Sequence, residues 1–159
     1  MADAARPIRP LQPADLPAAI RLVESEAKSN EWLEPIPEML EEAARGDGRE
    51  RRAICVSDGD DIVGLGVYGF ITGTEGTATI DAIVIAPDVR GKGLGSGIAR
   101  YIREDVRAAG GRLMIAELPS DPAISEYRAV LWGCGFRQES RIEDYYRDGM
   151  SLLQLRLEL

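Results

Sequence analysis

The chain has 159 residues, of which 45% are hydrophobic and 29% are charged, and its formal net charge is −8 at pH 7. This length suits one domain, and the composition is that of an ordinary globular protein. Non-specific binding of nucleic acid depends on Lys and Arg side chains that neutralise phosphates, so the acidic balance argues against it. The sequence has no histidine, which excludes imidazole as a catalytic base and as a metal ligand, and two cysteines make a thiolate metal site unexpected. No apolar run approaches the ~20 residues of a membrane span.

The cysteines and the first residues bear on cellular location. Cys55 and Cys134 do not have the spacing of a disulfide framework. Residues 1–10 contain arginines and prolines but no apolar stretch of the kind found in signal peptides. We therefore expect a reduced, cytoplasmic protein that binds neither membranes nor nucleic acid.

The first half of the chain predicts a short strand over residues 6–10, followed by two helices. Asp15 is placed to cap the first helix, whose apolar residues recur at helical spacing. A breaker-rich segment over residues 29–37 separates it from a second helix over residues 38–45. Three strand-like runs follow, joined by short Gly-rich turns, and we expect them to form an antiparallel meander: residues 52–57, 62–72 and 77–85.

The second half alternates helices and strands. Apolar residues at helical spacing from Leu94 to Ala109 predict a long helix, which Gly110 and Gly111 end. The strand after it, residues 113–118, is reached through this helix and should lie parallel to residues 77–85. A helix over residues 122–132 and two closing strands complete one α+β domain, residues 1–159, built on a mixed sheet.

The segment between the third strand of the meander and the long helix is the most informative. A proline, Pro87, ends the apolar strand, and four glycines then fall within seven residues: Gly91, Gly93, Gly95 and Gly97. Such a turn presents several backbone N–H groups at a helix N-terminus, where the helix dipole also favours an anion. Glycine suits it because a Cβ would hold the anion away from the backbone. The pattern predicts a phosphate or pyrophosphate site, although a Gly-rich turn without a ligand is the alternative.

Two common phosphate motifs do not fit this segment. The phosphate-loop motif needs Ser or Thr after Gly-Lys, but Gly93 follows Lys92. The dinucleotide motif GxGxxG fails from either starting glycine, because its third glycine would fall on Ser96 or Ile98. The pattern that remains is Arg90-x-x-Gly93-x-Gly95 after a strand that ends Val-Ile-Ala-Pro.

This remaining pattern resembles the acyl-CoA pyrophosphate signature of the GNAT superfamily of N-acetyltransferases. Weaker similarities in the expected order extend over nearly the whole chain: residues 8–16 resemble the opening strand and helix, residues 132–136 the "GF" turn, and residues 144–155 the closing hairpin. The resemblance implies a three-layer α+β fold, with a mixed central sheet of six to seven strands flanked by about four helices.

The resemblance also implies a donor, acetyl-CoA, and no metal. In the family, the strand before the turn diverges from its parallel neighbour, and CoA enters the gap between them. Carried over to this sequence, the pantetheine arm pairs with the backbone of Ile83, Val84 and Ile85. The pyrophosphate then lies on the turn, at Arg90, Gly91, Lys92, Gly93, Leu94, Gly95 and Ser96.

Two acids on the strands that flank this gap are candidates for the general base. An amine must lose its proton to attack a thioester, and a carboxylate with a raised pKa would accept that proton. Glu117 ends the strand over residues 113–118, and Asp81 interrupts an otherwise apolar strand. Each has a structural alternative: Glu117 as a solvated acid at a strand end, and Asp81 as the partner of an arginine or a backbone N–H.

The chain departs from the family at its proton donor. Many members carry a tyrosine four residues before the glycine of "GF", where this chain has Leu131, and the usual asparagine seven residues earlier is Ile124. Tyr127, Tyr145 or Tyr146 would have to substitute for it, but packing is an equally simple role for each. A thiolate is a fair leaving group without full protonation, since thiols titrate near 8.5.

We expect an N-acetyltransferase that moves an acetyl group from acetyl-CoA to a primary amine by direct attack in a ternary complex. The acceptor is a small-molecule or peptide amine whose identity the sequence does not specify, and the acyl chain length and a homodimeric state are also open. The alternative is a non-catalytic acyl-CoA-binding sensor or interaction module on the same fold.

Overall fold

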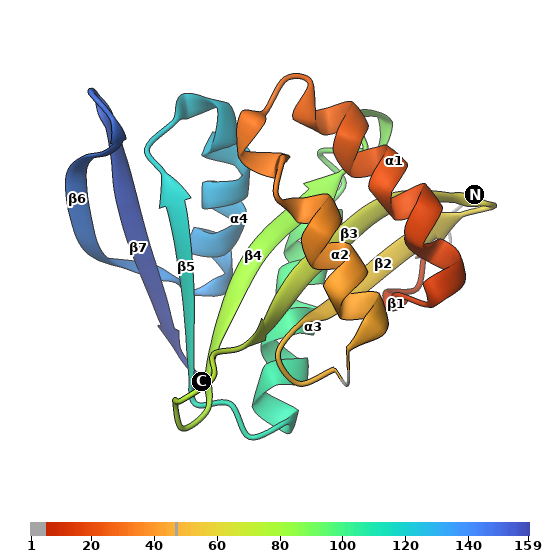
Figure 1. The fold of residues 1–159 in the computed structure, drawn as a ribbon, viewed down its shortest axis with the longest axis horizontal. Coiled ribbons are helices and arrows are strands. Elements are labelled where there is room, and N and C mark those ends of the chain that lie inside the picture. The colour runs from red at the N-terminus through yellow and green to blue at the C-terminus, as the bar shows by residue number, and fades with distance from the viewer. Residues whose placement is uncertain (1–5, 47) are drawn as a thin grey trace.

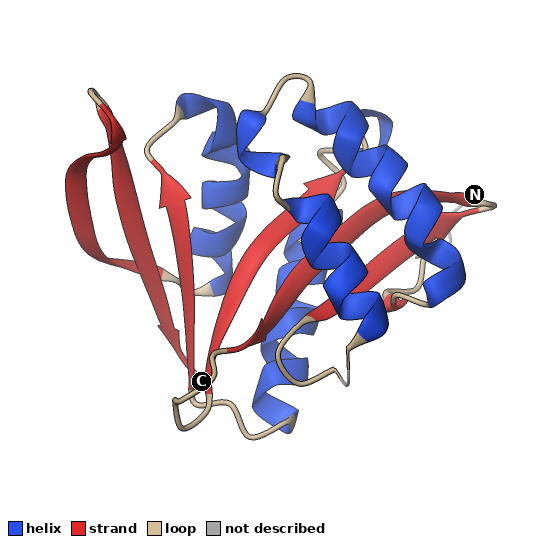
Figure 2. Ribbon diagram, viewed as in Figure 1, coloured by secondary structure: helices blue, strands red, loops and turns tan. Residues whose placement is uncertain are grey.

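A computed structural model describes residues 6–46 and 48–159, and its central feature is a seven-stranded mixed sheet (Figures 1 and 2). The strands lie in the order β1-β2-β3-β4-β5-β7-β6. Their bounds are β1 Arg9–Pro10, β2 Arg52–Asp58, β3 Asp61–Phe70, β4 Thr77–Ile85, β5 Leu113–Pro119, β6 Arg137–Arg147 and β7 Met150–Glu158. The fold class expected from the sequence, a three-layer α+β fold on a mixed sheet, is confirmed.

Helices cover both faces of the sheet and bury two separate clusters of apolar side chains (Figure 2). Helices α1 (Leu16–Ala27) and α2 (Ile36–Arg45) pack on one face, and α3 (Leu94–Ala108) and α4 (Ser125–Cys134) on the other. Short 3-10 turns precede or join these helices: Pro13–Asp15, Glu31–Leu33, Pro87–Val89 and Pro122–Ile124. The breaker-rich segment expected over residues 29–37 is shorter than predicted. Helix α2 begins at Ile36, two residues before its expected start, with Pro37 in its first turn.

The strand connections follow the sequence-based expectations. Strands β2, β3 and β4 form the antiparallel meander, and β5 pairs parallel to β4 after the α3 crossover. The closing strands β6 and β7 form an antiparallel hairpin, and β7 lies between β5 and β6. The order places the crossover, and therefore the Gly-rich turn before α3, at the middle of the sheet.

Strands β4 and β5 are neighbours over only three residue pairs. Thr77, Ala78 and Thr79 pair with Leu113, Met114 and Ile115, and beyond these pairs the two strands diverge (Figure 1). We call this gap, between β4 beyond Thr79 and β5 beyond Ile115, the fork. The backbone edge of β4 along the fork is not bonded to β5, so it is available to a ligand.

A β-bulge lies in β4 at the narrow end of the fork. Val67 of β3 pairs with Ala82 but the next residue, Tyr68, pairs with Ile80, so Asp81 is an extra residue on β4. A bulge bends its strand and increases the local twist, which helps to explain why β4 turns away from β5 at this point.

The two glycines of β3 that share a face are explained by helix packing. A Cβ at Gly66 would lie 2.8 Å from Ile102 Cδ1 and 2.9 Å from Ile98 Cγ2, both in α3. A Cβ at Gly64 would lie 3.1 Å from Leu94 Cδ2 in the same helix. These glycines let α3 approach the sheet closely, which fixes the position of its N-terminus beside the fork.

Asp15 takes a different role from the helix cap expected for it. Its side chain makes no capping bond to α1. It accepts hydrogen bonds from Arg9 (2.6 and 2.9 Å) and from the backbone N–H of Gln12 (2.8 Å), which ties β1 to the start of α1. The hydrogen bonds from Arg9 are the main cause that lowers the pKa of Asp15 to about 2.

The Asp15 ion pair should stabilise the fold in a pH-dependent way. A carboxyl whose pKa is lower in the folded chain stabilises above its unfolded pKa, 3.8, and this contribution is lost as pH falls towards 2. Asp15→Asn should therefore cost about 1 kcal/mol of unfolding free energy at pH 7, a value reduced for the part-exposed arginine. Urea unfolding at pH 7 and pH 3 would measure it, and the difference from wild type should narrow at pH 3. Asp58→Asn, which breaks the more exposed pair with Arg6, is the control and should change little.

Candidate active site

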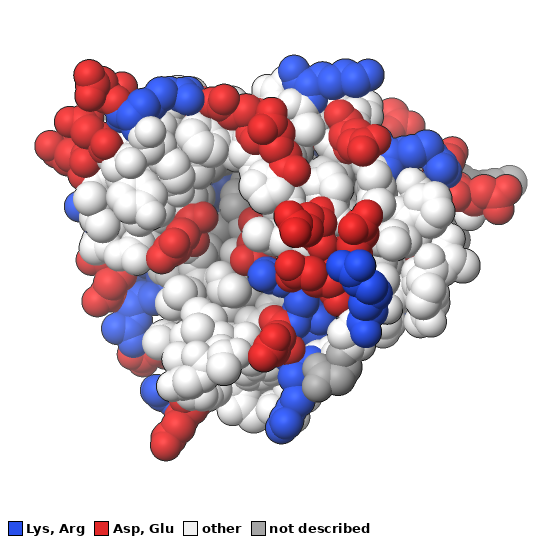
Figure 3. All heavy atoms as spheres, viewed as in Figure 1, with Lys and Arg blue, Asp and Glu red and all other residues white. Residues whose placement is uncertain are grey.

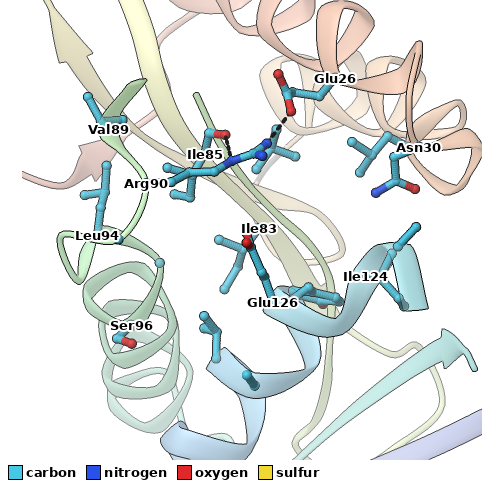
Figure 4. Close-up of a pocket in the computed structure, with 18 of the residues that line it drawn as sticks. Glu26, Asn30, Ile83, Ile85, Val89, Arg90, Leu94, Ser96, Ile124 and Glu126 are labelled. Atoms are coloured by element: carbon cyan, nitrogen blue, oxygen red, sulfur yellow. Dashed lines mark hydrogen bonds and ion pairs between the residues drawn. The ribbon is translucent and has the colours of Figure 1, made fainter. Parts of the chain in front are cut away.

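A cavity of about 570 Å³ lies at the fork, between α1 on one side of the sheet and α3 and α4 on the other (Figure 4). Its volume falls within the range typical of small-molecule sites, ~300–1,000 Å³. Four segments line it. They are the end of α1 and the residues after it (Glu26, Ser29, Asn30, Leu33), β4 (Ile83, Val84, Ile85), the Gly-rich turn (Val89, Arg90, Gly91, Gly93, Leu94, Gly95, Ser96), and the start of α4 (Ala123, Ile124, Glu126, Tyr127, Ala129, Val130).

The Gly-rich turn directs backbone N–H groups at one end of this cavity. The first hydrogen bond of α3 runs from Gly97 N to the carbonyl of Gly93 (3.0 Å), so the amides of Leu94, Gly95 and Ser96 precede the helix ladder. Gly91 and Gly93 have φ angles of +75° and +81°, which other residues rarely adopt, and a Cβ at either would meet no atom within 4 Å. The turn is therefore an open cradle of amides at a helix N-terminus, the arrangement that binds phosphates.

Strand β4 contributes backbone groups that face the fork. Ala86 N donates to the carbonyl of Val63 in β3 (2.8 Å). Because successive residues of a strand direct their backbone groups to opposite edges, Ile83 and Ile85 face the fork and Val84 faces β3. An extended amide-containing ligand in the fork would therefore find backbone partners at Ile83 and Ile85, with Val84 between them.

Nine of the ten residues expected to contact CoA line this cavity. Lys92 does not line it and is exposed. The structure thus gathers these nine residues in one place.

Arg90 is positioned differently from a simple phosphate ligand. Its Nε donates to the carbonyl of Ile85 (3.0 Å), and its Nη2 donates to the carboxylate of Glu26 in α1 (Figure 4). The guanidinium therefore spans the cavity from β4 to α1 and does not lie over the amides of Leu94 to Ser96.

Asp81, the first candidate base, lies at the narrow end of the fork, two residues beyond the last β4–β5 pair. Its side chain is 15% exposed and accepts a hydrogen bond from Arg51, which also lies 3.5 Å from Glu42 of α2. Burial raises the pKa of Asp81, and the Arg51 guanidinium only partly offsets this effect. A carboxyl with a raised pKa and a position at the fork has the properties of a general base.

Glu117, the second candidate base, lies opposite, two residues beyond the last pair on β5. Its side chain is exposed and accepts a hydrogen bond from Nε2 of Gln154 (2.9 Å), its partner on the adjacent strand β7. Neither Asp81 nor Glu117 lines the cavity at the Gly-rich turn; both stand at the narrow end of the fork.

The tyrosines that were considered as proton donors have packing partners or buried hydroxyls. Leu131, at the family's tyrosine position, is fully buried in the core. Tyr127 is one turn earlier in α4, and its hydroxyl is buried with no hydrogen-bond partner among the described residues; burial raises its pKa. Tyr146 contacts both Trp32 and Tyr145 edge-on, with ring centroids 4.9 Å apart in each pair. These three rings join the β6–β7 hairpin to the segment between α1 and α2.

Sequence reasoning missed the contribution of the end of α1 to the cavity. Glu26, Ser29 and Asn30 line it, and none of them was predicted as a site residue. A signal was present: Glu26 follows Ala19, Leu22 and Val23 at helical spacing on the buried face of α1, where an acid is unusual. Glu126, at the start of α4, was also missed, because nothing in its spacing marks it.

Two further observations bear on the class of site. Among residues 6–46 and 48–159, no cluster of three or more His, Cys, Asp or Glu side chains is arranged to hold a metal ion. No helix in these same ranges is long and apolar enough to span a membrane.

The sequence matches the acetyltransferase (GNAT) family over residues 18–131, which include the fork strands, the Gly-rich turn and most of α4. The chain belongs to the GNAT family. This GNAT protein is therefore an acyltransferase, and the resemblance first drawn from residues 84–97 is confirmed. No curated protein matches the sequence.

Solved structures similar to this GNAT protein cover nearly all of it. A protein described as a GNAT-family acetyltransferase from Desulfovibrio desulfuricans is 29% identical, with a TM-score of 0.86 over 97% of this chain and 99% of its own. The ribosomal-protein-alanine N-acetyltransferase of Brucella melitensis is 24% identical (TM-score 0.75; 96% and 99% covered). The IAA acetyltransferase of Bacillus cereus is 17% identical (TM-score 0.72; 98% and 100% covered). The last two support the fold alone.

Proposed function

We propose that this GNAT protein transfers an acetyl group from acetyl-CoA to a primary amine, and that the fork is where the two substrates meet. The observation that carries the proposal is the cavity itself. It joins an amide cradle at the N-terminus of α3 to the open backbone edge of β4, two features that suit the diphosphate and the amide-containing arm of CoA.

The residues present fit this donor. The amides of Leu94, Gly95 and Ser96 would bind the diphosphate, and the fork-facing carbonyl of Ile83 and N–H of Ile85 would pair with the pantetheine amides. Acetyl-CoA, when bound, supplies a thioester carbonyl that an amine can attack. Recognition through the backbone explains why the side chains at these positions are small or apolar.

Asp81 is our candidate for the general base. An alkylamine is largely protonated near neutral pH, since such groups titrate near 10.4. A carboxylate with a raised pKa at the narrow end of the fork would accept the proton as the amine approaches. Glu117, on the opposite strand, is the second candidate; its side chain is exposed and hydrogen-bonded to Gln154.

The backbone of β4 would also stabilise the charge that develops on the thioester oxygen. Ile83 N–H points into the fork without a partner strand, the geometry of an oxyanion-binding donor. Most of the rate enhancement would come from holding amine and thioester together in the fork. No assigned tyrosine is needed for the departing thiolate, because thiols titrate near 8.5.

The surface around the fork suits a basic acceptor. Figure 3 shows acidic side chains around the hollow between helices α1 and α2 and the strands β5, β7 and β6. Exposed acids include Glu117 on β5, next to the fork, and Glu31 in the segment between α1 and α2, which is ion-paired with Arg147 (2.9 Å). Such a field attracts cationic amines. We keep a small-molecule amine and a peptide N-terminus as acceptor classes, and a cytoplasmic location and homodimer as expectations of the proposal.

Release of free thiol from acetyl-CoA, measured with a panel of amines, tests this function. The panel should include alkyl diamines, lysine, and a peptide that begins with alanine, because the Brucella neighbour acts on a ribosomal-protein alanine. Turnover above background with at least one amine is expected. Tight binding of acetyl-CoA without turnover across the panel would instead favour the non-catalytic sensor.

A further inference from the structure

Arg90 and Glu26 form an ion pair that spans the cavity above the fork. Arg90 follows β4 directly and Glu26 belongs to α1, so the pair links two elements that are 64 residues apart in sequence. The same guanidinium also donates to the Ile85 carbonyl (3.0 Å), and Figure 4 shows it extended between these two partners. Arg90 therefore links the end of β4 to the part of α1 that lines the cavity.

Glu26 would be destabilising without its ion pair to Arg90. The residue is 9% exposed, and it lies on the buried face of α1 beside Val23 and Leu22. A carboxylate at such a depth is destabilising unless it is paired, so movement of Arg90 towards a phosphate would leave an uncompensated charge. The diphosphate has separate donors in the amides of the α3 N-terminus, which do not need the guanidinium.

We infer that Glu26 is a positioning residue for the acyl donor. It holds Arg90 in place as a link between α1 and β4, and this link sets the width of the cavity where the pantetheine arm would lie along β4. The inference rests on the proposed function, because it assumes that the cavity binds acyl-CoA. Ser29 and Asn30, one turn beyond Glu26, depend on this link for their position over the cavity.

The rival arrangement has Arg90 leave Glu26 and bind the diphosphate directly. The two arrangements predict opposite effects of Glu26→Gln. If Glu26 competes with the diphosphate for Arg90, its neutralisation should tighten acetyl-CoA binding. If Glu26 positions Arg90, its neutralisation should weaken binding.

The test compares two donors, acetyl-CoA and S-acetylpantetheine, which lacks the diphosphate. Glu26→Gln should lower kcat/KM by about tenfold with both donors, since both lie under the same part of α1, while kcat at saturating acetyl-CoA stays within about twofold. Glu24→Gln is the matched control, because Glu24 is an exposed acid on the same helix, and it should leave both values unchanged. Melting curves establish that each variant is folded.

Two further variants keep the inference testable if Glu26→Gln is unstable. Arg90→Lys keeps the charge, but the lysine amine cannot make both hydrogen bonds of the guanidinium. It should therefore lower kcat/KM by the same factor with both donors. In the double variant Arg90→Gln/Glu26→Gln, kcat/KM should fall no further than in Arg90→Gln alone, because both variants remove the same link, the ion pair between Arg90 and Glu26.

Several results would overturn the inference. The first is tighter binding of acetyl-CoA by Glu26→Gln. The second is a loss of kcat/KM with acetyl-CoA but not with S-acetylpantetheine. The third is an unchanged kcat/KM with both donors. If the wild type uses neither donor, the proposed function fails as well, so the two failures are distinguishable.

Discussion

The Ser96→Asp variant should lose about 100-fold in affinity for acetyl-CoA while its melting temperature stays equal to or above that of the wild type. Ser96 is the third residue of α3 and lines the cavity. A carboxylate there would repel a bound diphosphate by about 3 kcal/mol at close range, which corresponds to this loss of affinity. The same charge stabilises the helix N-terminus by interaction with the dipole, about 0.3–1 kcal/mol, so misfolding would not explain weaker binding.

Ser96→Asn is the matched control, because it adds the same bulk without the charge. Isothermal titration should give it an affinity within about threefold of the wild type, and the loss in Ser96→Asp should shrink at high salt. Equal affinities for the Asp and Asn variants would show that the diphosphate does not lie at this helix end. Substitutions at Gly93 are less informative, since its φ of +81° strains any side chain.

Asp81→Asn should lower kcat/KM by about 100-fold, the typical contribution of a general base. With an acceptor amine that stays neutral over the pH range, wild-type kcat/KM should rise with pH through the raised pKa of Asp81 and then level off. The rise follows because only the deprotonated carboxylate accepts a proton. In Asp81→Asn this rise should disappear.

Two variants separate catalysis by Asp81 from its ion pair. Arg51→Gln removes the same pair but keeps the carboxylate, so the pH-dependent rise should move to higher pH while the plateau rate is retained. Glu117→Gln should change kcat/KM by less than about threefold if Asp81 is the base. A larger loss in Glu117→Gln than in Asp81→Asn would transfer the role to Glu117.

Periodicity and turn residues predicted most of the fold. The strand over residues 77–85 is β4 as expected, and the crossover through α3 made the parallel pairing with β5 predictable. The Gly-rich turn was predictable because phosphate binding at a helix N-terminus leaves a local signal, glycines at fixed spacing after a strand. Local signals of this kind survive in a single sequence.

The features that sequence reasoning missed depend on contacts between distant residues. Apolar spacing predicted the helix that is α1 but not which of its faces is buried, and the buried residues are Ala19, Leu22, Val23 and Glu26. Glu26 is one of these buried residues, and its role depends on Arg90 in another element. The bulge at Asp81 could not be predicted from the sequence either, because it is defined by the pairing register of β4 with β3.

Amide chemical shifts of the isotope-labelled protein, recorded during titration with acetyl-CoA, test the central claim most directly. We expect the largest changes at the amides of Gly91, Gly93, Leu94, Gly95 and Ser96, followed by those of Ile83 and Ile85. Exposed amides of the β6 strand, at the far edge of the sheet, should not move. Saturable binding with the largest changes away from the α3 N-terminus and the fork, or no changes at all, would contradict it.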